Sequence, residues 1–222
     1  MRALTPELLD ILPAGDPRAI RSRRDLVLIN HLMRQPAIMA RALRAFPVPR
    51  SLADLGGGDG CFLLAVARRL AKHWPGVAVL ICDRQDIVAP ETRAAFQALG
   101  WNCEAHVGDV FDGLPQADII TANLFLHHFD DVALARLLAA VAARTDYFAA
   151  CEPRRGKFAL AGAHLVGLLG CNDVTRHDAV VSVQAGFAAQ DLSQHWPQHE
   201  RWSLHEGAAF PFSHVFQARR HV

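Results

Sequence analysis

The stretch Asp-Leu-Gly-Gly-Gly-Asp-Gly, residues 54–60, decides the fold of this chain. A short apolar segment at 51–55 leads into it, and a segment with helical spacing of apolar residues, 61–73, follows it. Four glycines in five positions let the backbone turn tightly and pass close beneath a ligand, where a Cβ atom would clash. The stretch therefore predicts a strand, a ligand-binding loop and a helix in succession. The alternative is a tight turn that binds nothing.

Strand-like and helix-like segments alternate along the rest of the chain. The pattern predicts strands at 51–55, 77–82, 102–107, 117–122 and 146–151, and helices at 61–73, 89–99 and 131–144. Such alternation builds right-handed βαβ units and a mostly parallel sheet. After residue 152 we expect helices at 158–169 and 185–195, then strands at 201–205 and 214–218 that can pair antiparallel at the sheet edge. The fold class is therefore α/β, with a mostly parallel sheet and an antiparallel C-terminal hairpin.

The first 49 residues have a different, helical character. Asp16-Pro17 combines an N-cap acceptor with a proline in the first turn, and so marks the start of a helix over 17–33. A second helix is predicted at 36–46, and two prolines then end the helical region. We therefore divide the chain into an N-terminal helical cap, 1–49, and a main domain, 50–222.

Composition excludes several function classes. The 23 basic and 22 acidic residues leave a formal charge of +1, which argues against nucleic acid or an anionic membrane as partner. The apolar run at 158–171 is too short to span a bilayer, and residues 1–15 lack the apolar core of a signal peptide. Five cysteines without a CxxC pair favour reduced thiols in a cytoplasmic protein.

The glycine loop does not fit the dinucleotide fingerprint GxGxxG. In the two possible registers the third glycine is replaced by Cys61 or by Leu63. This mismatch counts against the rival hypothesis of an NAD(P)-dependent oxidoreductase. What the loop does contain is Asp-x-Gly-x-Gly-x-Gly, formed by Asp54, Gly56, Gly58 and Gly60.

That pattern resembles the first motif of class I S-adenosyl-L-methionine (SAM)-dependent methyltransferases, which have a Rossmann-like fold. The resemblance implies SAM as cofactor, with Asp54 taking up its ammonium group directly or through water. Asp83 follows the second strand, where the family has its ribose-binding acid, and one carboxylate can accept hydrogen bonds from both ribose hydroxyls. Asp86 is a nearby rival, and a solvated loop acid is the alternative. After the third strand, Asp109 and Val110 match the positions that hold the adenine.

The run at 121–129, after the fourth predicted strand, includes Asn123 and ends in two histidines and a phenylalanine. Many small-molecule methyltransferases have a similar run beside the cofactor, so Asn123 joins the predicted cofactor-binding residues. Methyltransferases that act on amino groups of bases or of glutamine usually have Pro-Pro-aromatic here. Its absence counts against nucleic acid as substrate.

Three histidines are candidates for a general base that removes a proton from a phenolic acceptor: His127, His128 and His177. The alternative for each is a structural role in packing or hydrogen bonding. His195 and His199 have metal-like spacing, but a proline lies between them and no third ligand is evident, so the sequence predicts no metal site.

Flanking motifs resemble small bacterial methyltransferases that accompany type III polyketide synthases. They are Arg-Asp-Leu-x-x-x-Asn at 24–30, Thr-Arg-His-Asp at 175–178 and Ser-Val-x-x-x-Phe at 182–187. The resemblance implies O-methylation of a small, apolar phenolic or polyketide-like acceptor, with a substrate-side insertion around 153–195. The family often continues its fifth strand with Asn-Asp-Leu where this chain has Cys-Glu-Pro at 151–153, which leaves the role of Glu152 open. The other alternative is a SAM-binding module without catalysis. The sequence does not indicate an oligomeric state.

Overall fold

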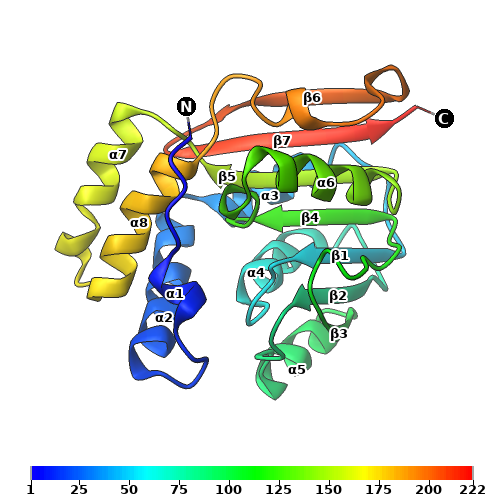
Figure 1. Cartoon of the computed structure of the whole chain (residues 1–222). Helices are drawn as coiled ribbons and strands as arrows, with labels where there is room; N and C mark the ends of the chain where they lie inside the picture. The colour runs from blue at the N-terminus through cyan, green and yellow to red at the C-terminus, as the bar shows by residue number, and fades with distance from the viewer. Residues whose placement is uncertain (1, 222) are drawn as a thin grey trace.

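A seven-stranded sheet with helices on both faces organises residues 2–221, the part of the chain that the computed structural model describes (Figure 1). The strands are β1 (Ser51–Leu55), β2 (Ala78–Asp83), β3 (Asn102–Val107), β4 (Ile119–Asn123), β5 (Tyr147–Pro153), β6 (Trp202–Ala209) and β7 (Ser213–Arg220). Their order is β3-β2-β1-β4-β5-β7-β6; the first five are parallel, while β7 runs antiparallel to β5 and to β6. The predicted fold class, including the antiparallel C-terminal hairpin, is confirmed.

Strand β1 is the centre of the parallel sheet, with β2 on one side and β4 on the other. Leu52, Ala53 and Leu55 are completely buried, as expected for a strand covered on both faces. Asp54 lies in register with Ile81 of β2 and with Thr121 of β4. Because the chain leaves β1 toward β2 on one side and reaches β4 only later on the other, the switch point of the topology lies at the carboxyl end of β1.

Eight α-helices accompany the sheet in the described residues. They are α1 (Leu8–Ile11), α2 (Pro17–Leu32), α3 (Gln35–Leu43), α4 (Cys61–Leu70), α5 (Pro90–Ala98), α6 (Asp131–Ala142), α7 (Lys157–His164) and α8 (Asp173–Ala185). The predicted starts of two of them are confirmed by their caps. The Asp16 side chain accepts from the Arg18 N–H ahead of α2, and Asp130 accepts from the Ala133 N–H ahead of α6.

Two apolar cores lie on opposite faces of the sheet. Helices α3, α4 and α5 pack on one face, and the large side chains Phe96 and Trp101 are buried there. Helix α6 and the segment 187–196 pack on the other face, where Phe148, Trp196 and Phe216 form an aromatic group. Burial on both faces fixes the sheet, and therefore the loops at its carboxyl edge.

The prediction of a helix at 185–195 is wrong. The structure has α8 at Asp173–Ala185 instead, followed by an isolated bridge at Phe187, a turn at 189–192 and a short 3-10 turn at Ser193–His195. The Asn172 side chain accepts from the Thr175 N–H and starts α8, and Gly186, with ψ −178°, ends it in an extended conformation. The Thr-Arg-His-Asp stretch at 175–178 is therefore helical.

The carboxyl ends of the parallel strands face helices from the N-terminal part of the chain and from the segment between β5 and β6. In Figure 1 the arrowheads of β2 and β4 point toward the side where α1, α2, α7 and α8 gather, and the start of the chain passes along α8. Helices α1 and α2 contact α8, and α3 contacts α4. Residues 2–221 include no helix with the length and apolar character needed to cross a membrane. All five cysteines are free thiols.

Candidate functional site

The loop after β1 has the conformation that its glycines allow. Gly56, Gly58 and Gly60 have φ of +64°, +54° and +75°, in the left-handed region that other residues adopt only with strain. A Cβ atom added to Gly58 would meet nothing within 4 Å, whereas one added to Gly56 would lie 2.2 Å from the Phe125 ring. Gly58 therefore borders open space, while Gly56 is required because an aromatic side chain packs directly on its backbone.

Asp83, the last residue of β2, is hydrogen-bonded to this loop. Its Oδ2 accepts from the Gly58 N–H at 3.0 Å, and its Oδ1 accepts from the Gln85 N–H at 3.1 Å. Each carboxylate oxygen retains a lone pair for a further donor. Its rival Asp86 forms an ion pair with Arg93 at 3.0 Å. The geometry therefore favours Asp83 over Asp86 as the acceptor beside the loop.

Unmet hydrogen-bonding capacity lies at the ends of two adjoining strands. Asp54 is 1% exposed, and its Oδ1 accepts from the Thr121 hydroxyl at 2.7 Å. Burial, together with the charge of Asp83, outweighs this hydrogen bond and raises the pKa of Asp54 to about 7. At the end of β4, the buried Oδ1 of Asn123 has no hydrogen-bond partner. A buried acid without a basic partner and an unsatisfied amide oxygen suit a ligand that brings a cation and donors.

Asp109 and Val110 follow β3, the strand beside β2. Asp109 is exposed, and its Oδ1 accepts from the Phe111 N–H at 2.9 Å, which closes a local turn. Val110 is half-buried and packs against the apolar core on the α6 side. The structure thus brings both residues to the same edge as Asp83, and their adenine-binding role stays a prediction.

His127 lies in a 3-10 turn after β4, and both of its ring nitrogens face carboxylates. Nδ1 is 2.8 Å from Glu152 Oε2, and Nε2 is 3.1 Å from Glu7 Oε1. Burial alone would lower the pKa of His127, but the hydrogen bonds and charges of Glu152 and Glu7 outweigh it and raise the pKa to about 9. The other Glu152 oxygen accepts from the N–H groups of Phe125 and Leu126, at 3.0 and 2.9 Å. In this arrangement His127 is a protonated, clamped imidazolium.

His128 shares the second oxygen of Glu7. Its Nε2 is 3.5 Å from Glu7 Oε2, its Nδ1 is 3.6 Å from Asp10 Oδ2, and its ring centroid is 4.3 Å from that of His127. Burial first, and then the charge of His127, lower the pKa of His128. The pKa values of these two neighbouring histidines therefore shift in opposite directions.

The structure does not bring His177 into this cluster. It lies on α8 in a surface groove with His164 and Arg176, and its Nδ1 is 2.9 Å from Asp178 Oδ1. The Asp178 carboxylate also accepts from the N–H groups of Leu8 and Leu9, at 2.8 and 3.0 Å. His177 thus neighbours the anchor of the N-terminal segment rather than the loop after β4.

Residues 2–12, which we call the N-terminal strap, cross the carboxyl edge of the sheet. The Arg2 guanidinium donates to the carbonyl oxygens of His127 and Phe129 and stacks over the Phe187 ring at 4.4 Å. The Ser182 hydroxyl of α8 donates to Glu7. Sequence reasoning missed Glu7 and left Glu152 open. The position of Glu152 at the end of a strand was a usable signal, whereas nothing in the sequence near Glu7 points to residue 127.

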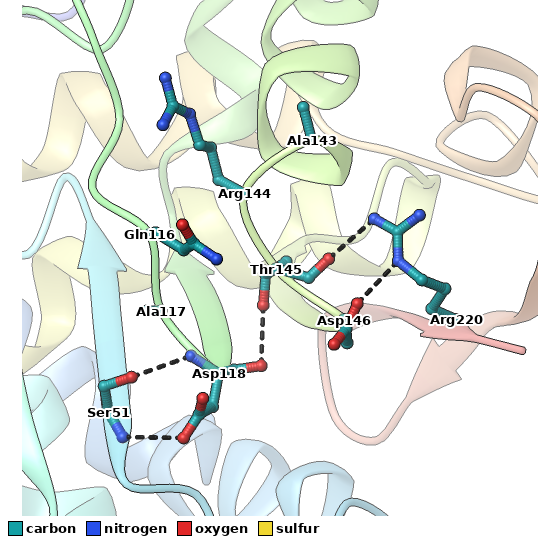
Figure 2. Close-up of a pocket in the computed structure, with 9 residues that line it drawn as sticks. All are labelled: Ser51, Gln116, Ala117, Asp118, Ala143, Arg144, Thr145, Asp146 and Arg220. Carbon is teal, nitrogen blue, oxygen red and sulfur yellow. Dashed lines mark hydrogen bonds and ion pairs between the residues drawn. The ribbon is translucent and has the colours of Figure 1, made fainter. Parts of the chain in front are cut away.

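A cavity of about 160 Å³ lies at the amino ends of the parallel strands, on the side away from the glycine loop (Figure 2). It is lined at the starts of β1, β4 and β5, where Ser51 and Asp118 exchange hydrogen bonds and Arg220 donates to Asp146. Several of its polar groups hydrogen-bond to one another, and ligands of open α/β sheets bind at the carboxyl ends of the strands. We therefore assign no site to this cavity.

Comparisons with known proteins identify relatives of this chain. Residues 21–157 match the family model described as the O-methyltransferase domain. The 3-O-methylredipecamine 2-O-methyltransferase of Carapichea ipecacuanha is 34% identical over 89 residues, which are 40% of this chain and 22% of that protein. The chain spans less than a third of the length of the curated relatives it matches.

Solved structures share the fold at low sequence identity. The mitomycin 7-O-methyltransferase superposes with a TM-score of 0.63 at 19% identity, over 93% of this chain and 59% of the other. Magnesium protoporphyrin IX methyltransferase from Synechocystis PCC 6803, crystallised with S-adenosylhomocysteine (SAH), gives 0.63 at 15% identity, over 94% and 96%. This agreement is one of fold, and the matched family model carries the relationship in sequence.

Proposed function

Because the chain belongs to the family of O-methyltransferase domains, we propose that it transfers a methyl group from SAM to a hydroxyl group of a small molecule. The observation that carries the proposal is a buried acid without a basic partner, Asp54, and an unsatisfied amide oxygen, that of Asn123, at adjoining strand ends beside a glycine loop that borders open space. Relatives and structural neighbours that carry out methyl transfer support it.

The residues at the carboxyl edge fit SAM on three counts. The buried Asp54 lacks a basic partner, and the ammonium of the methionine part would supply one. Asp83 retains acceptor capacity for the ribose hydroxyls, and Asn123 has an unsatisfied amide oxygen. Gly58 leaves room where any side chain would intrude. We propose that Asp109 and Val110 border the adenine.

When bound, SAM supplies an activated methyl group on a sulfonium. Transfer would be an in-line displacement, with the oxygen–carbon bond forming as the sulfur–carbon bond breaks and SAH as the leaving group, so this chain's residues would have to align the acceptor and exclude water. The acceptor hydroxyl must lose a proton, and His127 is the residue we propose to receive it at Nε2. Glu152 on the opposite nitrogen would stabilise the imidazolium that results. Since Glu7 occupies Nε2 in the strapped arrangement, this role requires Glu7 to withdraw.

The acceptor we propose is a small, apolar aromatic or polyketide-like phenol, as the resemblance to methyltransferases that accompany type III polyketide synthases implies. Three phenylalanines next to the histidine turn support this class. Phe125 and Phe129 lie 5.1 Å apart between ring centroids, and Phe129 and Phe111 lie 5.6 Å apart, both pairs edge to face. Aromatic side chains in this arrangement would favour binding of a flat apolar ring over binding of a nucleic acid or a charged peptide. Helices α7 and α8 would border the acceptor, and the free thiols support a reducing, cytoplasmic location.

The test has two stages. Titration calorimetry should detect binding of SAM and of SAH and no heat from NAD or NADP; binding of a nicotinamide cofactor instead would contradict the proposal. A screen of phenols with SAM carrying a labelled methyl group should then give O-methylated products. SAH binding with no transfer across the panel would favour the alternative of a cofactor-binding module without catalysis.

A further inference from the structure

We propose that Glu7, His127 and His128 form a binding site for one divalent transition-metal ion, with zinc as the best match. Their ligand atoms all lie within 4.8 Å of one another. The Glu7 oxygens are 3.1 Å from His127 Nε2 and 3.5 Å from His128 Nε2. Sequence spacing predicted no metal here, because two of the ligands are adjacent and the third comes from the other end of the chain.

The distances suit a tetrahedral ion. Zinc bonds to histidine nitrogen and carboxylate oxygen are about 2.0–2.1 Å long, so neighbouring ligand atoms around the ion are about 3.3 Å apart. Each imidazole has one Glu7 oxygen at close to that distance, Oε1 at 3.1 Å from His127 Nε2 and Oε2 at 3.5 Å from His128 Nε2, so the carboxylate faces both nitrogens. Imidazole nitrogen with a carboxylate is a donor set for zinc and its neighbours in the first transition row rather than for magnesium or calcium.

The outer partners of the histidines also fit. A metal-binding histidine usually donates its other ring N–H to a carboxylate or carbonyl, which fixes the tautomer and the ring orientation. Here Nδ1 of His127 faces Glu152 at 2.8 Å, and Nδ1 of His128 faces Asp10 at 3.6 Å. The Nε2 atom of His128 is buried and has no hydrogen-bond partner, so it is free to coordinate an ion.

The charge around the cluster is the third argument. Three carboxylates, from Glu7, Asp10 and Glu152, surround two imidazoles in a largely buried space. Arg2 and Arg84 are the cations whose charges act on this group, but the Arg2 guanidinium is engaged by backbone carbonyls and by Asp131. A divalent cation between Glu7 and the histidines would take the place of the His127 proton among these carboxylates.

The consequence for methyl transfer rests on the proposed function. A metal ion would hold Glu7 of the N-terminal strap to both histidines and would occupy the His127 nitrogen that we propose as the proton acceptor. Metal binding would therefore lock the strap and inhibit transfer. The binding itself is independent of that role, so failure of the two proposals can be told apart.

The experiment uses the full chain, stripped of metal with a chelator, and zinc competed against a chromogenic chelator. We expect one tight zinc per chain, with affinity reduced at least tenfold by Glu7→Gln and by His128→Ala. His205→Ala, at an exposed histidine of β6, should keep the wild-type affinity. Cobalt in place of zinc should give the intense visible bands of tetrahedral coordination, and these should disappear in the first two variants.

Equal affinity in all four proteins would assign the zinc to surface histidines and overturn the proposal, and so would the absence of tight binding. Glu7→Gln keeps the shape of the side chain, and circular dichroism checks its fold, so the test stands even if His128→Ala fails to fold. Zinc that inhibits methyl transfer by the wild type, with relief by a chelator, would support the locked strap. If SAH fails to bind while zinc binds, the proposed function fails and the metal site stands.

Discussion

The Nε2 atom of His127 lies 3.1 Å from the Oε1 atom of Glu7, although 120 positions separate the two residues in the chain. The contact joins the N-terminal strap to the turn after β4, where the reactive end of a bound acceptor is expected. Arg2 and Asp178 fix the strap on either side of it. The Glu7 carboxylate in this arrangement favours the protonated form of His127. For Nε2 to take a proton from the acceptor hydroxyl, Glu7 must therefore move away.

Glu7→Gln should shift the pH dependence of methyl transfer. The Glu7 carboxylate helps to raise the pKa of His127 to about 9, so its loss should lower that pKa. A base works only when deprotonated, and kcat/KM reports the pKa values of the free enzyme, hence the rising limb of kcat/KM against pH should move to lower pH in the variant. Glu200→Gln, at an exposed position, is the control and should keep the wild-type profile. Identical kcat/KM limbs in wild type and Glu7→Gln would contradict the proposal that His127, with its pKa raised by Glu7, is the base.

Asp83→Ala should weaken SAH by about ten- to a hundredfold, because hydrogen bonds to a charged group contribute roughly 1.5–3 kcal/mol. Asp86→Ala is the matched control, since Asp86 lies three residues further on and pairs with Arg93. Calorimetry on both variants gives the comparison. If Asp86→Ala rather than Asp83→Ala weakens SAH binding, Asp86 is the ribose acceptor. If both variants bind SAH within twofold of wild type, neither aspartate binds the ribose.

Gly58→Val should abolish SAH binding and leave the chain folded. A side chain at this position enters the open space beside Asp83, where we expect the bound SAH to lie. Gly76→Val matches it closely: φ is +69° against +54°, and a Cβ atom would again meet nothing within 4 Å. Both variants carry a left-handed strain of about 1–2 kcal/mol, so thermal unfolding should shift alike in the two. Binding that survives in Gly58→Val would show that this face of the loop does not meet the ligand.

The sequence predicted the sheet well because its central strands β1, β2 and β4 are largely apolar and because glycines or acids stand near the ends of several strands. The bounds of β1 and β3 were predicted without error, since residues 51–55 and 102–107 are set off by strong local signals. The helix at 185–195 failed because Gly186 ends α8 instead of starting a new helix. The cofactor loop could be found locally. The Glu7–His127–Glu152 cluster could not, since it depends on three segments that only the folded chain brings together.

SAH binding should strengthen as the pH rises from 5.5 to 7.5. Burial raises the pKa of Asp54 to about 7, and the ionised carboxylate is the form that pairs with the ligand's ammonium. Below that pKa, binding must displace a proton, so affinity should rise by up to about tenfold for each pH unit. The window stops at 7.5 because an α-amino group titrates near 7.7–8.0. Asp54→Asn should flatten the dependence, and a flat wild-type profile would contradict the assigned pairing.

Alanine variants of the three candidate histidines should separate a base from structural roles. His127→Ala should lower kcat by about 10²–10⁴, the range for general base catalysis, with little change in SAH affinity. His177→Ala should cost less than tenfold, because His177 lies in the outer groove between α7 and α8. His128→Ala should have an intermediate effect, since it contacts Glu7 at 3.5 Å and touches the ring of His127. Glu152→Gln should reproduce part of the His127 loss, because the amide cannot stabilise the imidazolium as the carboxylate does.

Each variant needs its unfolding temperature and SAH affinity measured beside kcat. Three histidine variants within tenfold of wild type would sink the base model, and alignment and desolvation of the acceptor would then account for the rate.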